Sequence, residues 1–478
     1  MLTYFPKYFT NRAIILYFAT LLVVFIWFIE FKMDFIWYVF GIFEVLFFFI
    51  GSHNFILSWK SLSPNKYKKK LFWTTFIISF IYVTITYFMY IDLRGEPFEF
   101  DPTDGLAYHE DSVWFVEMFK DGYLSDYWKV FISLHELSDT GYIIYLNIVY
   151  LLTDNSIFIA RILKCFYHAW LCVLIYKIAA RNFSESTARM AAIFCMLMPQ
   201  ILFYTCSHRK EMEMILLSTL CIERIDFLLR NAKNQIKQII LAILLIGLLF
   251  TFRTVIGIAA AFGMVSALLL TSTNLISKRR KWFIGVWAGI AAIVVLGGPI
   301  INEVESIWQR KISGAAGKSM EWRASESNAG SDGRTNTFAK YAGAAVFAPL
   351  ITVFPFPTMV RIADQENQQR LNGGYFIKNF MGLFVLLMLF KELKTKQFKK
   401  HILIFGYTFS YLGIIALSEF AQSERFHLPA LPFLLMFAAY GIETFNNKNK
   451  KFVPWYIIFL FLVNVGWNWF KLAGRGMA

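Results

Sequence analysis

The sequence predicts an all-α polytopic membrane protein with about thirteen transmembrane helices and two sizeable loops outside the cytoplasm. Hydrophobic residues make up 57% of the chain and charged residues only 17%, a balance that does not describe a soluble surface. Many apolar segments are long enough to cross a hydrocarbon core of roughly 30 Å at about 1.5 Å per residue. Lysine and arginine gather in alternate connectors between these segments.

Spanning helices are expected near 12–30, 34–56, 71–91, 156–180, 186–205, 212–228, 236–252, 254–271, 282–300, 374–391, 401–419, 428–445 and 453–470. No cleavage site of small residues follows the first apolar run, and a second run comes at once. The first run is therefore predicted to be an anchor and not a removable signal peptide.

The distribution of basic residues orients the predicted bundle. A net charge of +15 could indicate nucleic-acid binding, but the basic residues lie mostly in short connectors. The clearest of these are 66–70, 230–237, 278–281, 391–400 and 448–451. This positive-inside pattern predicts a cytoplasmic N-terminus and argues against nucleic acid as a partner.

Four regions follow from this pattern: two additional N-terminal helices with a basic loop (1–70), a core with an acidic outer loop (71–300), an outer loop with an interfacial segment (301–373), and the C-terminal helices (374–478). The outer loop 92–140 carries twelve of the 32 acidic residues against three basic ones. Residues 142–152 are too few to cross, which predicts an amphipathic interfacial helix. Residues 344–360 are apolar and broken by proline, which predicts a re-entrant or interfacial piece.

The first candidate site is an acidic turn, Asp101-Pro-Thr-Asp104-Gly, followed by Tyr108 and His109 at the expected membrane rim. A carboxylate there could take a proton from an acceptor hydroxyl of a lipid-borne reaction. Pro102 and the glycine favour a tight turn that would direct Asp104. The alternative is an acidic loop with a helix N-cap.

The second candidate is a polar stripe within an apolar helix. Arg161, Lys164 and His168 are spaced i, i+3 and i+7 and therefore share one face. Charges at membrane depth usually face a protein interior or wet cavity, so an anionic headgroup or phosphate is a fitting partner. Alternatively, Arg161 reaches the outer interface and Lys164 pairs with a carboxylate.

Two further basic groups are expected outside, where the positive-inside rule disfavours them. The run His208-Arg209-Lys210-Glu211 follows the end of a predicted helix, and Arg425 lies where another begins, beside free N–H groups. Arginine and lysine in such places could bind phosphate or pyrophosphate. A polar hairpin and a membrane-interface anchor are the respective alternatives.

The five cysteines, Cys165, Cys172, Cys195, Cys206 and Cys221, lack metal-ligand spacing and are predicted to be small packing residues. The sequence identifies no cofactor, and a divalent metal ion stays an open question.

These elements, in this order, resemble bacterial family 39-like glycosyltransferases of the integral membrane GT-C class. The resemblance spans most of residues 92–445. It rests on the D-x3-Y-H element at 104–109, on GYIIYLNIVYLLTDNSIFIARIL, on ARMAAIFCMLMPQILFYT with the following Lys210-Glu211, and on ERFHLPALP.

The resemblance implies a GT-C-like, inverting glycosyltransferase that uses a polyprenyl-phosphate sugar and a glycan, lipid or protein acceptor. It implies a bacterial inner membrane and a role in cell-surface polysaccharide or glycoconjugate biosynthesis. Asp104 would be the catalytic base, with Asp101 as the second candidate, while Arg425 and Lys210 would bind the lipid phosphate. The chain departs from the family where Asp104-Gly105 replaces two adjacent acids, and in its two extra N-terminal helices.

Two other functions compete with this one. A polysaccharide polymerase or ligase would use polyprenyl-pyrophosphate-linked glycans, and it would need arginines such as Arg323 or Arg334 in the second outer loop. A lipid or solute transporter would be expected to show paired repeats and broken helices, and the sequence indicates neither.

Overall fold

The computed structural model describes residues 7–100, 102–134, 137–230, 235–270, 350–363, 365–417 and 423–473. Within these ranges all regular secondary structure is helical. Twelve of the thirteen expected helices fall in this part of the chain, and eleven of them each coincide with one helix of the structure. The expected helix at 282–300 lies outside the described residues.

Six helices are long and apolar enough to cross a membrane. They are α1 (Lys7–Trp27), α2 (Phe35–Ser58), α3 (Pro64–Arg94), α7 (Ile157–Asn182), α17 (Asn372–Thr395) and α20 (Phe452–Ala473). The helix expected at 186–205 is instead two, α8 (Glu185–Leu197) and α9 (Pro199–Cys206), bent by 47°. Pro199 lacks the N–H that would continue α8, so the break falls there. If this pair counts as one span there are seven. The chain is thus a helical membrane protein.

The remaining helices of the bundle are α10 (Glu211–Arg230), α11 (Gln235–Phe252), α12 (Thr254–Leu270), α16 (Glu366–Arg370), α18 (Ile402–Leu417) and α19 (Leu431–Glu443).

Local sequence sets several helix boundaries. The hydroxyls of Ser156 and Ser184 accept hydrogen bonds from backbone N–H groups in the first turns of α7 and α8. Gly95, at a φ of 77°, ends α3 in the left-handed region that glycine tolerates best.

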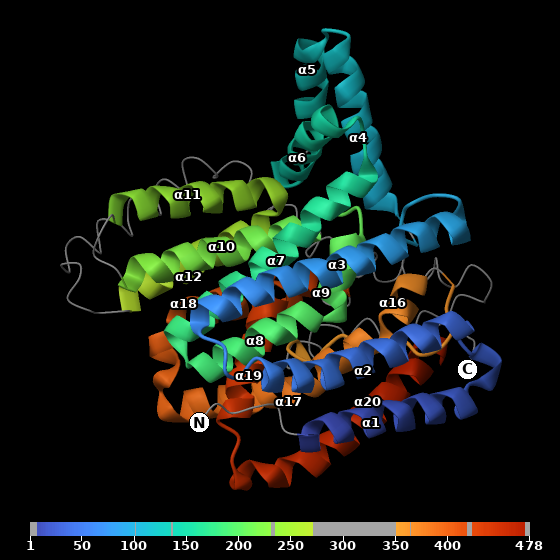
Figure 1. Ribbon diagram of the computed structural model, residues 1–478, viewed down its shortest axis with the longest axis vertical. Helices are drawn as coiled ribbons and strands as arrows, with labels where there is room; N and C mark the ends of the chain where they lie inside the picture. The colour runs from blue at the N-terminus through green and yellow to red at the C-terminus, as the bar shows by residue number, and fades with distance from the viewer. Residues whose placement is uncertain are drawn as a thin grey trace.

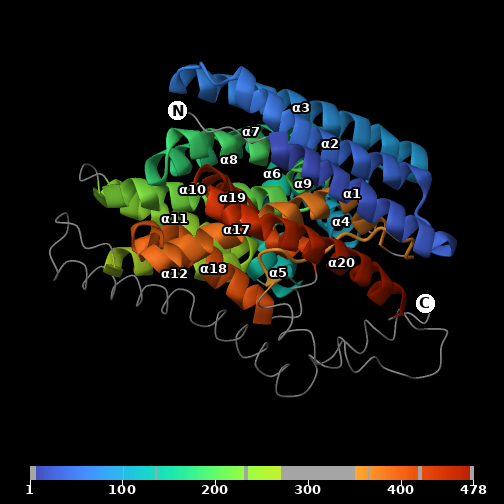
Figure 2. The same ribbon diagram turned by 90° about the horizontal axis from the view of Figure 1, so that it is seen from below.

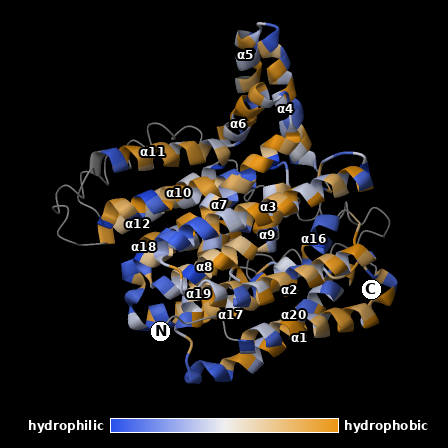
Figure 3. Ribbon diagram, viewed as in Figure 1, coloured by the Kyte–Doolittle hydropathy of each residue, from blue (hydrophilic) through white to orange (hydrophobic). Residues whose placement is uncertain are grey.

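The long helices run side by side (Figure 1), with α1, α2 and α3 gathered on one side of the bundle when it is seen from below (Figure 2). Apolar residues extend along them, and hydrophilic residues gather near their ends (Figure 3). Because successive helices reverse direction, the connectors 59–63, 396–401 and 446–451 meet at one end of the bundle, here called the basic end. The connectors 95–100, 207–210 and 423–430 lie at the opposite end, here called the site end.

Helices also form in the predicted acidic loop. α4 (Thr103–Lys120), α5 (Leu124–Leu134) and α6 (Leu137–Thr153) build an arm that stands at a steep angle to the long helices (Figure 1). Buried aromatic rings hold it together, with the centroids of Phe115 and Tyr127 4.6 Å apart. The short helix predicted at 142–152 is present within α6. The helices α4 and α5 in the expected loop were not predicted, because the high acidic content concealed their apolar faces.

The predicted re-entrant piece is partly within the described residues. From 350 to 363 the chain is mostly irregular and buried, and side chains of α17 and α20 bind its backbone. Asn379 donates to the Pro355 carbonyl at 2.9 Å, while the side-chain carbonyl of Asn468 accepts from the Met359 N–H at 2.6 Å. Irregular backbone at membrane depth is stable only where protein groups satisfy it in this way.

Candidate functional site

The candidate site lies at the site end, where several separate segments converge. Asp104 stands in the first turn of α4, Lys210 just before α10, Arg253 between α11 and α12, and Arg425 in the short 3-10 helix Glu424–His427. Arg425 forms an ion pair with Asp104, and Lys210 forms one with Asp139 of α6. The Arg253 guanidinium lies 4.3 Å from the centre of the Phe426 ring, next to Arg425.

The pair Asp104–Arg425 remains accessible. The side chain of Asp104 is 43% exposed and that of Arg425 is 26% exposed, so a substrate could reach both. Burial raises the pKa of the Asp104 carboxyl, but Arg425, Arg209 and Lys210 together hold that pKa below its usual value. Asp104 is therefore a carboxylate at neutral pH and can accept a proton.

The glycine after Asp104 has a geometric explanation. A Cβ at Gly105 would lie 3.1 Å from the His208 carbonyl oxygen and 3.4 Å from Oε1 of Glu99. A larger side chain would push α4 away from the 207–210 connector. A close helix contact therefore occupies the position after Asp104, with the Glu99 carboxylate beside it.

A second, buried charge cluster lies directly behind this pair. The Glu99 carboxylate accepts hydrogen bonds from Nε of Arg209 at 2.8 Å and from the His208 backbone N–H at 3.2 Å, and Arg161 lies 3.8 Å away. Glu99 and Arg161 are fully buried. Burial raises the pKa of Glu99, but the two arginines overcome this and lower it, so the carboxylate stays charged. We call Glu99, Arg161 and Arg209 the buried cluster.

The polar stripe of α7 faces protein and not the membrane interface. Lys164 is buried, donates hydrogen bonds to the Ser207 carbonyl at 3.0 Å and to the Arg209 carbonyl, and lies 3.5 Å from the Glu213 carboxylate. Arg161 does not reach the interface, and its guanidinium has no hydrogen-bond partner among the described residues. His168 bonds Ser79 and the Cys195 carbonyl in the core. This stripe therefore positions the 207–210 connector.

The two predicted histidines are joined through a tyrosine. The Tyr150 hydroxyl lies 2.6 Å from Nδ1 of His109 and 3.0 Å from Nε2 of His208. Burial lowers the pKa of both histidines, so both rings are neutral at pH 7. The Tyr108 hydroxyl donates to Asp139 at 3.2 Å, beside Lys210. This network links α4, α6 and the 207–210 connector.

The structure thus brings Asp104, Tyr108, His109, His208, Arg209, Lys210, Glu211 and Arg425 to one end of the bundle, with Arg161 and Lys164 buried behind them. Asp101 lies outside the described residues. No group of three or more histidine, cysteine, aspartate or glutamate side chains in the described part of the chain is arranged to hold a metal ion. All five cysteines are buried and free.

Sequence reasoning missed Glu99, Asp139 and Arg253. Arg253 could have been found, because it is a basic residue in a connector between two apolar segments on the predicted outer side, where Lys210 is also expected. Glu99 and Asp139 carry no such signal. They are two of twelve acidic residues in one region, and only packing distinguishes them.

Comparison with known proteins gives one match. A family model described as dolichyl-phosphate-mannose-protein mannosyltransferase matches residues 141–297. No curated protein and no solved structure matches the chain. In the described residues the matched range includes α7, the 207–210 connector and Arg253. Asp104 and Arg425 lie outside the matched range, which is narrower than the range of the resemblance, 92–445. The match confirms the resemblance to a membrane glycosyltransferase of the GT-C kind.

Proposed function

We propose that this protein transfers a sugar from a polyprenyl-phosphate donor to a glycan, lipid or protein acceptor outside the cytoplasm, with Asp104 as the base. The family match supports glycosyl transfer by a membrane protein. The observation that carries the site assignment is the accessible ion pair between Asp104 and Arg425 at the site end.

The pair supplies both groups that such a transfer needs. Asp104 accepts the proton of the acceptor hydroxyl as the hydroxyl oxygen bonds to the anomeric carbon of the sugar. The bond from that carbon to the phosphate oxygen breaks, and the lipid phosphate leaves with the bonding electrons. Attack opposite the leaving group inverts the anomeric configuration. Arg425 and Lys210 stabilise the negative charge of the leaving phosphate.

The ion pair also suggests an order of events. Arg425 can exchange the Asp104 carboxylate for the donor phosphate, because both are oxyanions that a guanidinium binds in the same way. Donor binding would then free Asp104 to face the acceptor. Base and cation would thus be paired in the empty site and separated in the loaded one.

The surroundings of the pair take supporting roles in this proposal. Tyr108, His109 and His208 shape the site wall, and the buried cluster together with Lys164 fixes the 207–210 connector. Glu211 acts electrostatically on Arg425 and orients it. The proposed topology has about thirteen spans, a cytoplasmic N-terminus and the site end outside a bacterial inner membrane. The proposed role is cell-surface polysaccharide or glycoconjugate biosynthesis.

The test is glycosyl transfer in membranes from extracted polyprenyl-phosphate sugars, comparing wild type with Asp104→Asn at matched expression. Loss of the base should lower transfer by about 10²- to 10⁴-fold. Glu110→Gln, an exposed carboxylate on the same helix, is the control and should transfer normally. If Asp104→Asn is folded and transfers at the wild-type rate, Asp104 is not the base.

A further inference from the structure

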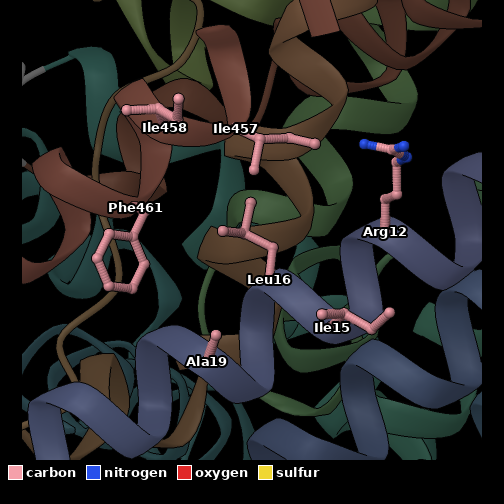
Figure 4. Close-up of a pocket in the computed structure, with 7 residues that line it drawn as sticks. All are labelled: Arg12, Ile15, Leu16, Ala19, Ile457, Ile458 and Phe461. Carbon is pink, nitrogen blue, oxygen red and sulfur yellow. The ribbon is translucent and has the colours of Figure 1, made fainter. Parts of the chain in front are cut away.

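A separate feature lies on the flank of the bundle, where α1 and α20 pack side by side (Figure 4). The groove between them has a volume of about 510 Å³. Its apolar lining consists of Ile15, Leu16 and Ala19 from α1 and Ile457, Ile458 and Phe461 from α20. Among the described residues that line it, Arg12 is the one with a charged side chain.

The shape of the groove follows from side-chain size along α1. Ile15 and Ala19 are four residues apart and share a face, so the small alanine leaves a hollow beyond the isoleucine. Leu16 is buried and forms part of the floor, whereas Ile15 and Ile458 are 66% and 49% exposed. Outward-facing apolar side chains on membrane helices contact lipid, so the groove opens to the hydrocarbon of the bilayer.

Charge makes one end of the groove different from the other. Arg12 stands beyond the apolar side chains at one end (Figure 4), in the second turn of α1. Lys7 begins the same helix, and Lys448, Lys450 and Lys451 directly precede α20. None of these five side chains forms an ion pair with a described residue. The basic end of the bundle therefore places unneutralised positive charge at the mouth of an apolar groove.

We propose that this groove binds one anionic phospholipid, with its phosphate at Arg12 and an acyl chain along Leu16 and Ala19 toward Phe461. Basic pockets between membrane helices on the positive side attract anionic headgroups, and the apolar lining suits a hydrocarbon chain. From Arg12 to Ala19 the helix rises about 10 Å. A groove of this length can hold part of an acyl chain but is too short for another membrane-spanning helix.

This site is distinct from the donor site proposed above. Arg12 lies near the start of α1, at the basic end. The chain then crosses the bundle three times, in α1, α2 and α3, and so reaches Asp104 at the opposite, site end, where Arg425 also lies. The headgroup of an outward-facing sugar donor would be at the wrong end for Arg12. The lipid proposal therefore does not depend on the proposed transferase function.

The experiment measures lipid bound to the purified full chain by native mass spectrometry, after addition of phosphatidylglycerol or phosphatidylcholine with identical acyl chains. Wild type should bind phosphatidylglycerol more tightly. Arg12→Gln should reduce that preference about fivefold, the factor contributed by one basic residue near an anionic headgroup. Ala19→Phe should fill the hollow and weaken binding of both lipids.

Matched controls separate the groove from the general surface. Lys69→Gln removes an exposed charge at the same end of the bundle, and Ile85→Phe adds bulk to an exposed face of α3; neither should change binding. Ala19→Leu is a milder filling if Ala19→Phe does not fold. Equal binding of the two lipids to wild type, or an unchanged preference in Arg12→Gln, would overturn the proposal. So would displacement of phosphatidylglycerol by an equal concentration of polyprenyl phosphate, since the groove would then hold the carrier.

Discussion

Two charge assemblies lie one behind the other at the site end, and they differ in burial far more than in chemistry. In the buried cluster, Glu99 and Arg161 have no exposed surface, and Arg209 is only 11% exposed. In front of it, Asp104 and Arg425 form a similar carboxylate–guanidinium pair that is partly open. A buried pair cannot separate without leaving a desolvated charge, whereas an open pair can exchange a partner for a substrate at little cost.

The two assemblies are coupled through the 207–210 connector. The Glu99 carboxylate accepts hydrogen bonds from the His208 N–H and the Arg209 side chain. The His208 carbonyl in turn lies close to Gly105 of α4, next to Asp104. Arg209 also lowers the pKa of Asp104. The buried cluster is thus a positioning device for the open pair, and variants in the two should fail in different ways.

The largest effect on stability is expected from Glu99→Gln. The change removes the negative charge between two desolvated arginines, and breaking a buried pair typically costs about 3–5 kcal/mol. The thermal unfolding midpoint of the purified protein should fall clearly below that of wild type, with Glu110→Gln as the exposed control. Normal stability combined with lost transfer would instead assign Glu99 to the chemistry and would break the comparison.

Arg425→Gln should show the opposite signature. The ion pair with Asp104 is partly solvated, so its loss should cost about 1 kcal/mol or less of stability. Transfer should fall by about 10²- to 10³-fold, as when one electrostatic stabiliser of a transition state is removed. Unfolding and transfer measured on the same preparation distinguish the two cases, and a strongly destabilised Arg425→Gln would contradict an exchangeable pair.

The same arginine should set the acid limit of activity. Arg425 helps to lower the pKa of Asp104, so the base stays deprotonated, and transfer persists, below the usual range of an aspartate. In Arg425→Gln that pKa rises, and the acidic limb of the kcat/KM profile should move to higher pH. Arg425→Lys keeps the charge and should leave the limb nearer its original position. An unshifted limb in Arg425→Gln would mean that Arg425 does not control the base.

The smallest effect on transfer is expected at the junction between α4 and α6. Tyr150→Phe removes the hydroxyl between His109 and His208 and leaves a buried ring nitrogen without that partner. Such a loss costs about 1–3 kcal/mol, and transfer should change by less than in Arg425→Gln. A transfer defect as large as that of Asp104→Asn, in a stably folded variant, would show that the two histidines take part in the reaction.

Much of the helical framework could be predicted, because apolar length and proline placement act locally. The helices expected within the described residues are present, except that the one expected at 186–205 breaks at Pro199 into α8 and α9. Six or seven of the described helices are long and apolar enough to span a membrane. The arm of α4 to α6 could not be recognised from its composition. Its acidic residues dominate the average hydropathy of the region. The apolar contacts that stabilise the arm, such as that between Phe115 and Tyr127, join different helices.

By itself the sequence determined that the chain is a helical membrane protein and which residues gather at each end. Hydropathy and connector charge are properties of contiguous stretches, so they can be determined without knowing which segments pack together. The sequence also pointed to Asp104, which lies in a turn at the expected membrane rim, and to Arg425, whose charge is unusual on the outer side. Only the tertiary structure decided that these two meet, 321 positions apart, and that Glu99 rather than another acid is buried behind them. The physical reason is that pairing and desolvation depend on which distant segments pack together, and no local pattern records that.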